Sequence, residues 1–202
     1  MGLLTYCITP NHVHLLAVPD DPETISRFMQ KLEGEFAEYY NIRKRRSGAF
    51  WGGRYGCTMV DGGTYLWNCM KYIDLNMVRA RVVDHPSEWG WCGYDELVGA
   101  RQRYRLIDLD CVLERLGRKS RERFIQEYRR AVRASIREGK LEREALWTES
   151  IAVGSEEFTK RISERVRYRI RLERKEHQEG IWAVRELPVP YQPKRRSLSN
   201  QC

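Results

Sequence analysis

The apolar residues of this chain follow two different periodicities, and this difference constrains the fold more than any other feature. Residues 3–9 and 12–18 are largely apolar and are interrupted only at Pro10-Asn11, which predicts one extended strand. From Pro22 to about Arg43 the apolar side chains recur at helical spacing, which predicts an amphipathic helix. The chain is therefore expected to combine strands with helices.

Two further elements are expected before residue 100, and the composition changes after it. We expect a short strand at residues 55–60 and a second helix at residues 64–80, whose apolar stripe faces a core. Charged residues become more frequent from about residue 100, so we divide the chain into residues 1–100, a mainly helical region at 101–182, and a basic tail at 183–202. The tail is rich in proline and basic residues and is predicted to be disordered.

The charge balance favours a polyanionic partner. Of the 202 residues, 36 are lysine or arginine and 28 are aspartate or glutamate, which gives a formal charge of +8. Nucleic acid is the first candidate for such a partner. Ribosomal, metabolic and membrane-associated proteins can be equally basic, so the motifs must decide.

Cysteine spacing and the N-terminal sequence indicate a cytoplasmic protein. The six cysteines form no C-x-x-C pair, so reduced thiols are the simplest interpretation. The first residues lack a basic leader, and no apolar run is long enough to cross a membrane. There is also no phosphate-binding loop, dinucleotide fingerprint or serine nucleophile elbow, which argues against ATP or NAD chemistry.

His12 and His14 are candidate metal ligands. Residues two apart in a strand point to the same side, so both imidazoles would meet at one point. Such a pair can hold a divalent metal and leave coordination positions open for substrate. Taken alone, the pair is a weak signal, and the alternative of two polar histidines on the solvated face of a strand is preferred to it.

Tyr72 and Asn76 are candidates for the same site. They are four residues apart in the second predicted helix and therefore share a face away from its apolar stripe. Tyrosine is a poor nucleophile at its usual pKa, but a metal that polarises a phosphate reduces this difficulty. The alternative is that Tyr72 borders the core and that Asn76 is a surface residue.

A basic loop with aromatic residues follows the first predicted helix. Cations with interleaved aromatic rings suit phosphate contacts and base stacking in single-stranded or hairpin nucleic acid. A solvated charged run followed by core aromatics is the alternative. The expected DNA contacts are Arg43, Lys44, Arg45, Arg46, Trp51, Arg54 and Tyr55, together with Arg79 from the second helix.

These motifs, in this order, resemble the REP-associated tyrosine transposases of bacteria, which belong to the single-tyrosine HUH transposases. The sequence PNHVHLL at residues 10–16 matches the family's histidine motif, and YIDLNMVRA at residues 72–80 matches its tyrosine motif. The resemblance covers about residues 5–100 and continues more weakly beyond them. It implies that Tyr72 is the nucleophile, that His12 and His14 bind metal, and that Asn76 is the third ligand.

The resemblance also implies a fold and a reaction. The fold is a ferredoxin-like α+β domain with a central antiparallel sheet. The reaction is nicking and rejoining of single-stranded DNA at imperfect hairpins, through a 5′-phosphotyrosine and a free 3′-hydroxyl. Mg²⁺ or Mn²⁺ is the implied ion; manganese suits two imidazoles better, and we expect activity with both.

Two departures from the family pattern affect the expectations. Relatives usually have a further strand and helix before the histidine strand, so we expect a marginally stable chain, a homodimer, or a misassigned start codon. Met77 replaces the usual proline, which is expected to keep the helix continuous past Asn76. Two other functions stay open: a truncated remnant that binds hairpin DNA or RNA without cutting it, and a nuclease that uses metal-activated water.

Overall fold

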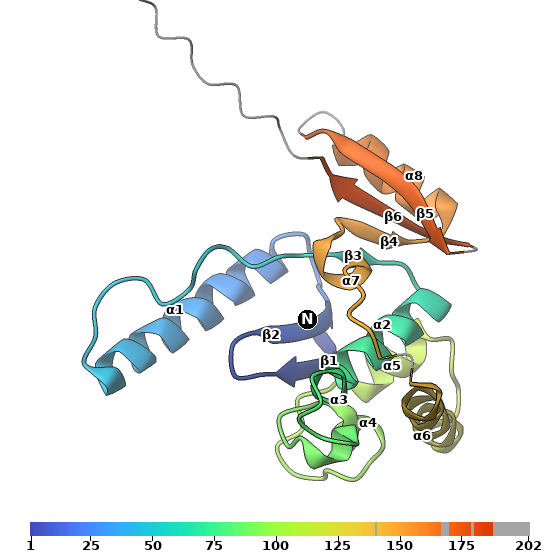
Figure 1. The fold of residues 1–202 in the computed structure, drawn as a ribbon, viewed down its shortest axis with the longest axis horizontal. Helices are drawn as coiled ribbons and strands as arrows, with labels where there is room; N and C mark the ends of the chain where they lie inside the picture. Colours follow the sequence, from blue (N-terminus) through green and yellow to red (C-terminus); the bar gives the residue numbers. More distant parts are fainter. Residues whose placement is uncertain (140, 167–169, 179, 188–202) are drawn as a thin grey trace, which may run out of the picture.

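The structure, a computed structural model, describes residues 1–139, 141–166, 170–178 and 180–187 (Figure 1). The chain begins with two antiparallel strands, β1 (Gly2–Ile8) and β2 (Val13–Val18), in which Cys7 pairs with His14. The single strand expected at residues 3–18 is therefore wrong. The chain reverses at Pro10-Asn11, where the Thr9 N–H donates to the His12 carbonyl oxygen over 2.9 Å and closes the turn.

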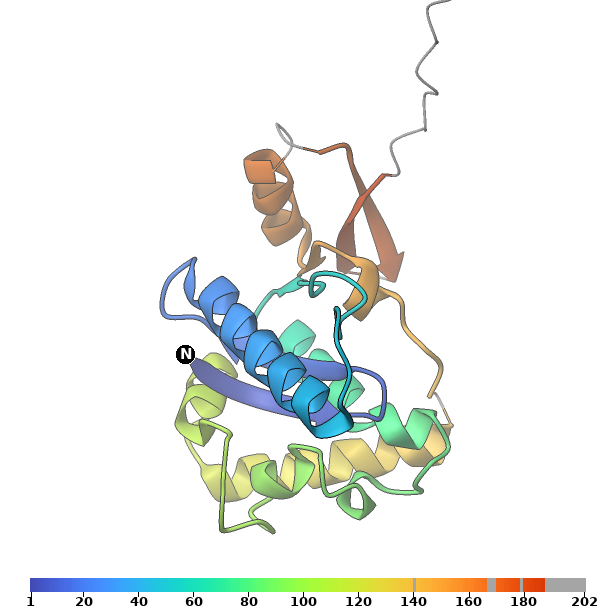
Figure 2. The ribbon, with the colours of Figure 1, turned by 90° about the vertical axis from the view of Figure 1, so that its left-hand side faces the viewer.

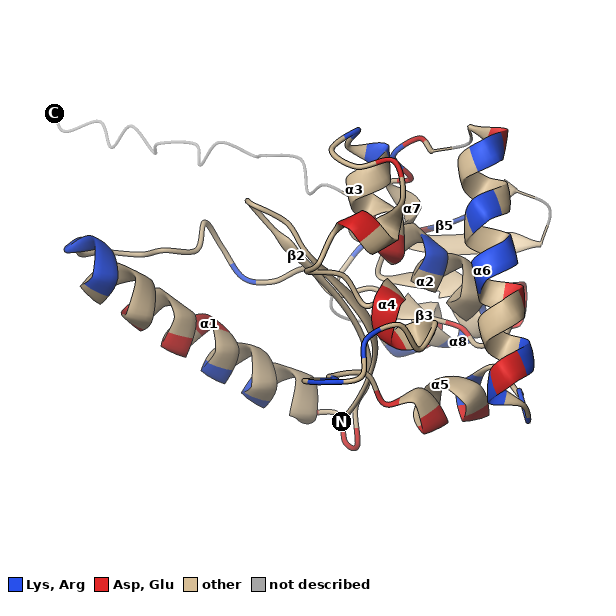
Figure 3. Ribbon diagram, turned by 90° about the horizontal axis from the view of Figure 1, so that it is seen from below, with Lys and Arg blue, Asp and Glu red and all other residues tan. Residues whose placement is uncertain are grey.

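Helix α1 (Thr24–Lys44) agrees with the helix predicted from Pro22 to about Arg43. It ends where Arg45 adopts a left-handed backbone conformation with φ 50°. None of its residues is buried. The helix lies on the opposite side of the β1–β2 hairpin from α2 (Thr64–Asp74) (Figures 1 and 3), and it is nearest the viewer in Figure 2.

The second predicted helix is divided in two. Helix α2 ends at Asp74, and the short α3 (Asn76–Arg79) follows after Leu75, whose ψ of 6° departs from helical geometry. The continuous helix expected at residues 64–80 is therefore wrong. Leu75, Met77 and Val78 are all buried around this interruption.

Strands from distant parts of the chain form a second sheet. Its order is β3 (Met59–Val60), β4 (Ala152–Gly154), β6 (Ile181–Glu186) and β5 (Leu172–Gln178), with β3 and β4 parallel and the other pairs antiparallel. Helix α8 (Glu156–Val166) packs against it. The strand expected at residues 55–60 is reduced to its last two residues, because only these reach β4.

The strands after residue 150 were not anticipated from the sequence. Residues Ala152, Val153, Ala183 and Val184 of these strands are almost completely buried. Their burial in the sheet stabilises the strands although charged residues are frequent in the neighbouring sequence. Residues 183–186 thus belong to β6 rather than to a disordered tail. Leu187 follows β6, and residues 188–202 of the expected tail lie outside the described residues.

The remaining helices build the other side of the molecule. They are a 3₁₀ turn η1 (Pro86–Glu88), α4 (Tyr94–Leu97), α5 (Leu109–Arg115), α6 (Arg121–Glu138) and α7 (Leu146–Glu149). In α6, the helical spacing of Phe124, Tyr128 and Val132 buries all three side chains completely. The Ser120 hydroxyl accepts a hydrogen bond from the Arg123 N–H at the start of α6, which satisfies one of its free N–H groups.

A buried carboxylate links three elements of the core. Asp74 of α2 is 1 % exposed and accepts hydrogen bonds from the Thr5 hydroxyl of β1 over 2.5 Å and from the Tyr128 hydroxyl of α6 over 2.6 Å. Burial raises the pKa of Asp74 to about 7, although both hydrogen bonds oppose this shift. One hydrophobic core therefore includes residues on both sides of residue 100, and the division into regions there stays a prediction.

The fold class is confirmed as α+β. The described strands form two separate sheets, where the family resemblance implies one central antiparallel sheet. Among the described residues, no helix combines the length and apolar character needed to cross a membrane.

Candidate active site

The β1–β2 hairpin brings the two predicted metal ligands together. His12 lies at the turn and His14 two residues later in β2. Their Nε2 atoms are 3.0 Å apart, and the ring centroids are 4.7 Å apart with the planes nearly perpendicular. The two imidazoles therefore converge through the same ring nitrogen.

Two polar side chains next to His12 set its tautomer. The Nδ1 atom of His12 lies 2.8 Å from the Asn11 Oδ1 atom and 3.0 Å from the Thr9 hydroxyl oxygen. The amide oxygen can only accept a hydrogen bond, so Nδ1 carries the proton and Nε2 keeps its lone pair. This arrangement prepares His12 to bind a cation through Nε2.

Both imidazoles are held in the neutral form. Burial, together with the charges of His12 and Arg79, lowers the pKa of His14 to about 4. Burial also lowers the pKa of His12, and the positive charge of Arg143 adds to this effect. Neutral imidazole is the form that coordinates metals.

The histidine pair fits a divalent metal. Two nitrogen ligands in adjacent positions of an octahedral ion, each about 2.1 Å from it, are separated by about 3 Å. The two Nε2 atoms are 3.0 Å apart, which is also a hydrogen-bonding distance. Within the described part of the chain, no group of three His, Cys, Asp or Glu side chains could hold a metal ion.

Tyr72 lies beside the histidine pair. Its ring centroid is 6.2 Å from that of His14, and the Arg79 guanidinium carbon lies 3.8 Å from the centre of the tyrosine ring. The residue is only 6 % exposed. Burial raises the pKa of Tyr72, whereas the positive charges of Arg79 and Arg143 lower it. The site therefore contains a protonated phenol with cations close enough to favour its ionisation.

The third predicted ligand is less directly connected to this group. Asn76 begins α3 and is half-buried. Across the described residues, no hydrogen bond joins its side chain to His12, His14 or Tyr72. The structure thus brings together three of the four predicted residues, and the role of Asn76 stays a prediction.

The basic loop lies apart from this group. Figure 3 shows basic residues at the end of α1 that points away from the rest of the molecule. Lys44, Arg45 and Arg54 are exposed. Arg43 donates to the Tyr39 hydroxyl over 2.8 Å, and Arg46 lies 5.8 Å from both the Tyr40 and the Phe50 rings.

The predicted base-stacking residues Trp51 and Tyr55 hold the loop against α1. The Trp51 indole N–H donates to the Glu33 carbonyl oxygen over 2.9 Å, and its ring packs on Phe50 and Phe36. The Tyr55 hydroxyl lies 3.1 Å from the Ser26 hydroxyl. These contacts explain the aromatic residues structurally, and their contact with DNA stays a prediction.

The sequence analysis missed residues that the second half of the chain contributes. The Trp147 ring of α7 lies 6.2 Å from the Tyr72 ring, and Arg143 and Glu144 precede it. The positive charge of Arg143 lowers the pKa of both His12 and Tyr72. No spacing rule could identify these residues, because they are remote from Tyr72 in sequence.

Comparison with known families gives a match over the first part of the chain. The sequence model described as "Transposase IS200 like" matches residues 1–76. This stretch contains both histidines, Tyr72 and Asn76, so the part of the chain that carries the site is similar to the IS200-like transposases. Comparison with curated proteins and with solved structures gives no match.

Proposed function

We propose that this protein is a metal-dependent DNA nickase and strand transferase of the REP-associated tyrosine transposase type. The observation that carries the proposal is the convergence of His12 and His14 beside Tyr72, with Arg79 stacked on the tyrosine ring. This arrangement combines a cation site with a nucleophile within one part of the fold. The similarity of residues 1–76 to IS200-like transposases supports the same function.

The proposed reaction exchanges one phosphodiester bond for another. The Tyr72 phenolic oxygen attacks a phosphorus atom of single-stranded DNA and loses its proton to solvent. The bond from phosphorus to the 3′-oxygen breaks, and that oxygen takes up a proton to become a free 3′-hydroxyl. A 5′-phosphotyrosine remains, and attack by another 3′-hydroxyl reverses the step and joins strands without ATP.

His12 and His14 would hold the divalent ion, with Asn76 proposed as a further ligand. Bound there, Mg²⁺ or Mn²⁺ would polarise the phosphate and stabilise the departing oxygen. Arg79 lies against the phenol and opposes the increase in its pKa that burial causes. The neutral state of both imidazoles keeps them available as ligands at physiological pH.

The proposed substrate is single-stranded DNA that forms hairpins, bound in the cytoplasm. Arg43, Lys44, Arg45, Arg46 and Arg54 would contact its phosphates. Arg43, Lys44 and Arg45 lie at the end of α1 that points away from the rest of the molecule (Figure 3), and this position suits a hairpin held at one place and cut at another. We further propose that residues 101–182 extend the DNA contact.

A covalent adduct provides the decisive test. We expect a labelled hairpin DNA to become attached to the protein in denaturing gels when Mn²⁺ is present, and chelator to prevent this. Tyr72→Phe should abolish the adduct, whereas Tyr94→Phe, which removes another largely buried phenol hydroxyl, should leave it intact. An undiminished adduct in Tyr72→Phe would overturn the proposal, and cleavage without any adduct would indicate attack by metal-activated water.

One observation favours a second candidate function. Tyr72 is only 6 % exposed, which suits a protein that binds hairpin DNA or RNA without cutting it. That alternative predicts salt-sensitive binding that chelator does not change, together with no adduct under any condition.

A further inference from the structure

A cavity lies next to the tyrosine site but is built by the second half of the chain. Its volume is about 250 Å³. One wall is the segment that leads into α7, and the other is the β5–β6 hairpin. The lining residues are Arg143, Glu144, Ala145, Leu146, His177, Gln178, Ile181 and Arg185.

The cavity has a fixed position relative to the nucleophile. The Tyr65 hydroxyl of α2 donates to the Gly180 carbonyl oxygen in the hairpin turn over 2.6 Å, and Ile181 packs against the main core. Helix α2 also carries Tyr72, whose ring lies near Trp147 of α7. Both walls are therefore attached to the nucleophile's helix.

Arg143 lies on the segment that joins the cavity to the tyrosine site. It lines the cavity together with Leu146, and the ring of the next residue, Trp147, lies 6.2 Å from that of Tyr72. The ion pair of Arg143 with Glu149, at 3.0 Å, joins two exposed side chains and is therefore weak. The Arg143 guanidinium is thus available to an anion in the cavity.

The polar groups of the cavity favour an anionic ligand. The Nε atom of Arg185 is buried and has no hydrogen-bond partner, which is unusual for a guanidinium. The one carboxylate in the lining, that of Glu144, accepts a hydrogen bond from the Trp147 indole N–H over 2.8 Å. The cavity is therefore lined by the guanidinium groups of Arg143 and Arg185 and by one carboxylate, which already accepts a hydrogen bond from within the protein.

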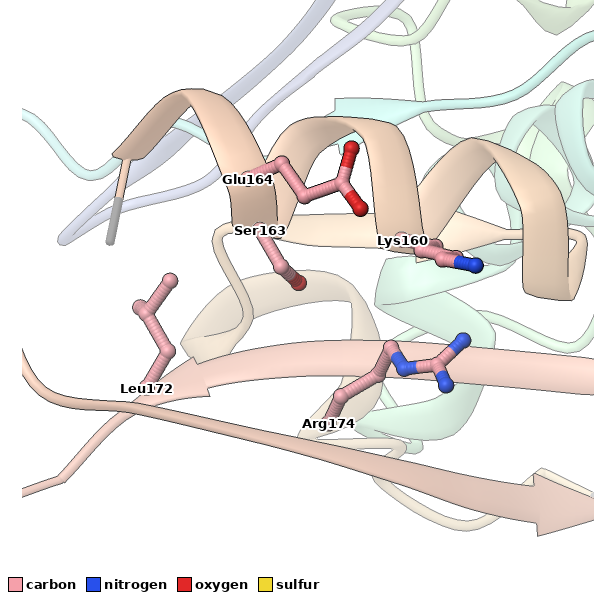
Figure 4. Close-up of a pocket in the computed structure, with 5 residues that line it drawn as sticks. All are labelled: Lys160, Ser163, Glu164, Leu172 and Arg174. Carbon is pink, nitrogen blue, oxygen red and sulfur yellow. The ribbon is translucent and has the colours of Figure 1, made fainter.

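A second cavity of the same region shows the contrast. Lys160, Ser163 and Glu164 of α8 lie across it from Leu172 and Arg174 of β5 (Figure 4), and its volume is about 270 Å³. Here the Arg174 guanidinium donates to the Glu156 carbonyl oxygen over 3.2 Å and lies 4.7 Å from the Trp182 ring centre. Its arginine already has partners within the protein, so this second cavity gives no sign of a missing anion.

We propose that the cavity lined by Arg143 and Arg185 is a nucleotide subsite that holds the single-stranded DNA next to the phosphate attacked by Tyr72. Arg143 and Arg185 bind the backbone phosphate, and Gln178 and His177 offer hydrogen bonds to the base or sugar. The second half of the chain thereby positions the strand for the reaction. This inference rests on the proposed function for its substrate, but binding can be measured without cleavage.

The test measures binding of a labelled oligothymidylate of about ten nucleotides by fluorescence anisotropy. The full-length chain carries Tyr72→Phe throughout so that no cleavage occurs. Arg143→Gln and Arg185→Gln are compared with Lys160→Gln, which removes one charge from the second cavity. Ala145→Phe fills the proposed subsite without changing the charge, and thermal melting confirms that each variant is folded.

We expect Arg143→Gln, Arg185→Gln and Ala145→Phe each to weaken binding by about tenfold, and Lys160→Gln to have little effect. Each arginine variant should also reduce the slope of log affinity against log salt by about 0.7, the value for one lost single-strand phosphate contact. Equal affinities for all four variants would overturn the subsite, as would tighter binding of an oligouridylate of the same length, which would indicate RNA.

Failure of this inference is distinguishable from failure of the proposed function. If the wild-type chain forms the covalent adduct but the cavity variants bind DNA normally, only the subsite is wrong. If no adduct forms and the cavity variants still lose affinity, the subsite stands as part of a DNA-binding protein. In a cleaving protein, Arg185→Gln should raise the DNA concentration needed for half-maximal adduct formation without changing the maximal rate.

Discussion

Replacing Tyr128 with phenylalanine tests whether the buried carboxylate of Asp74 stabilises the fold. Phenylalanine keeps the ring contacts with Phe124, at 5.5 Å, and with Trp67, at 5.2 Å between centroids. The change therefore removes only the hydroxyl that donates to Asp74 over 2.6 Å in a completely buried position. A hydrogen bond to a charged group contributes about 1.5–3 kcal/mol, so we expect a loss of about 2 kcal/mol at a pH of about 8, where the carboxyl is mostly ionised.

Urea denaturation followed by circular dichroism measures this loss as a lower midpoint with an unchanged slope. Thr5→Val, which removes the other hydroxyl donor to Asp74, should cost a similar amount. Asp74→Leu leaves two buried hydroxyl groups without their acceptor and should cost about 2–5 kcal/mol. Tyr94→Phe is the control, since its hydroxyl has no hydrogen bond to a described residue. If Tyr128→Phe is within about 0.5 kcal/mol of wild type, the reasoning about this network is wrong.

Three further predictions concern the hairpin, the cation site and the tyrosine. Asn11→Ala removes the acceptor for the His12 Nδ1 proton and should weaken Mn²⁺ binding by about 10–100-fold, as measured by calorimetry. An unchanged affinity for Mn²⁺ would show that the Asn11 amide does not set the tautomer of His12. Gly93→Ala places a Cβ atom 2.5 Å from the Thr5 hydroxyl oxygen and 3.1 Å from the Tyr6 backbone nitrogen. Thermal unfolding should therefore show that the free energy of unfolding falls by about 1–3 kcal/mol. A variant as stable as wild type would contradict this close approach. Arg79→Gln removes the cation stacked on Tyr72 and should slow adduct formation at least tenfold in a timed gel assay. Arg105→Gln, at an exposed position, is the control and should not slow it. Equal rates for the two variants would show that Arg79 takes no part in the reaction.

The sequence was sufficient where local periodicity and spacing decide the structure. The long amphipathic pattern of α1 predicted this helix, because it presents apolar residues at helical intervals. The spacing of His12 and His14 predicted their convergence, since a strand repeats every two residues. Tyr72 was associated with them through motif order and resemblance, and the structure places its ring beside His14.

The sequence was insufficient where contacts between distant segments decide. The reversal at Pro10-Asn11 produces a hairpin because β1 finds its partner in β2, which periodicity cannot distinguish from one interrupted strand. Strand β4 has only three residues and forms because it is inserted between β3 and β6. Such short strands carry almost no local signal, and their pairing supplies the stability.

The sequence by itself determined the long helix α1 and the identity of the histidine and tyrosine motifs, because these depend on intervals between neighbouring residues, and the resemblance that the motifs carry implied the α+β class. Only the tertiary structure decided that Asp74 connects β1, α2 and α6, that Arg79 stacks on Tyr72, and that Arg143 and Trp147 approach the site from the second half of the chain. The physical reason is that burial and charge act through space, and residues about 70 positions apart along this chain become neighbours only when the core has formed.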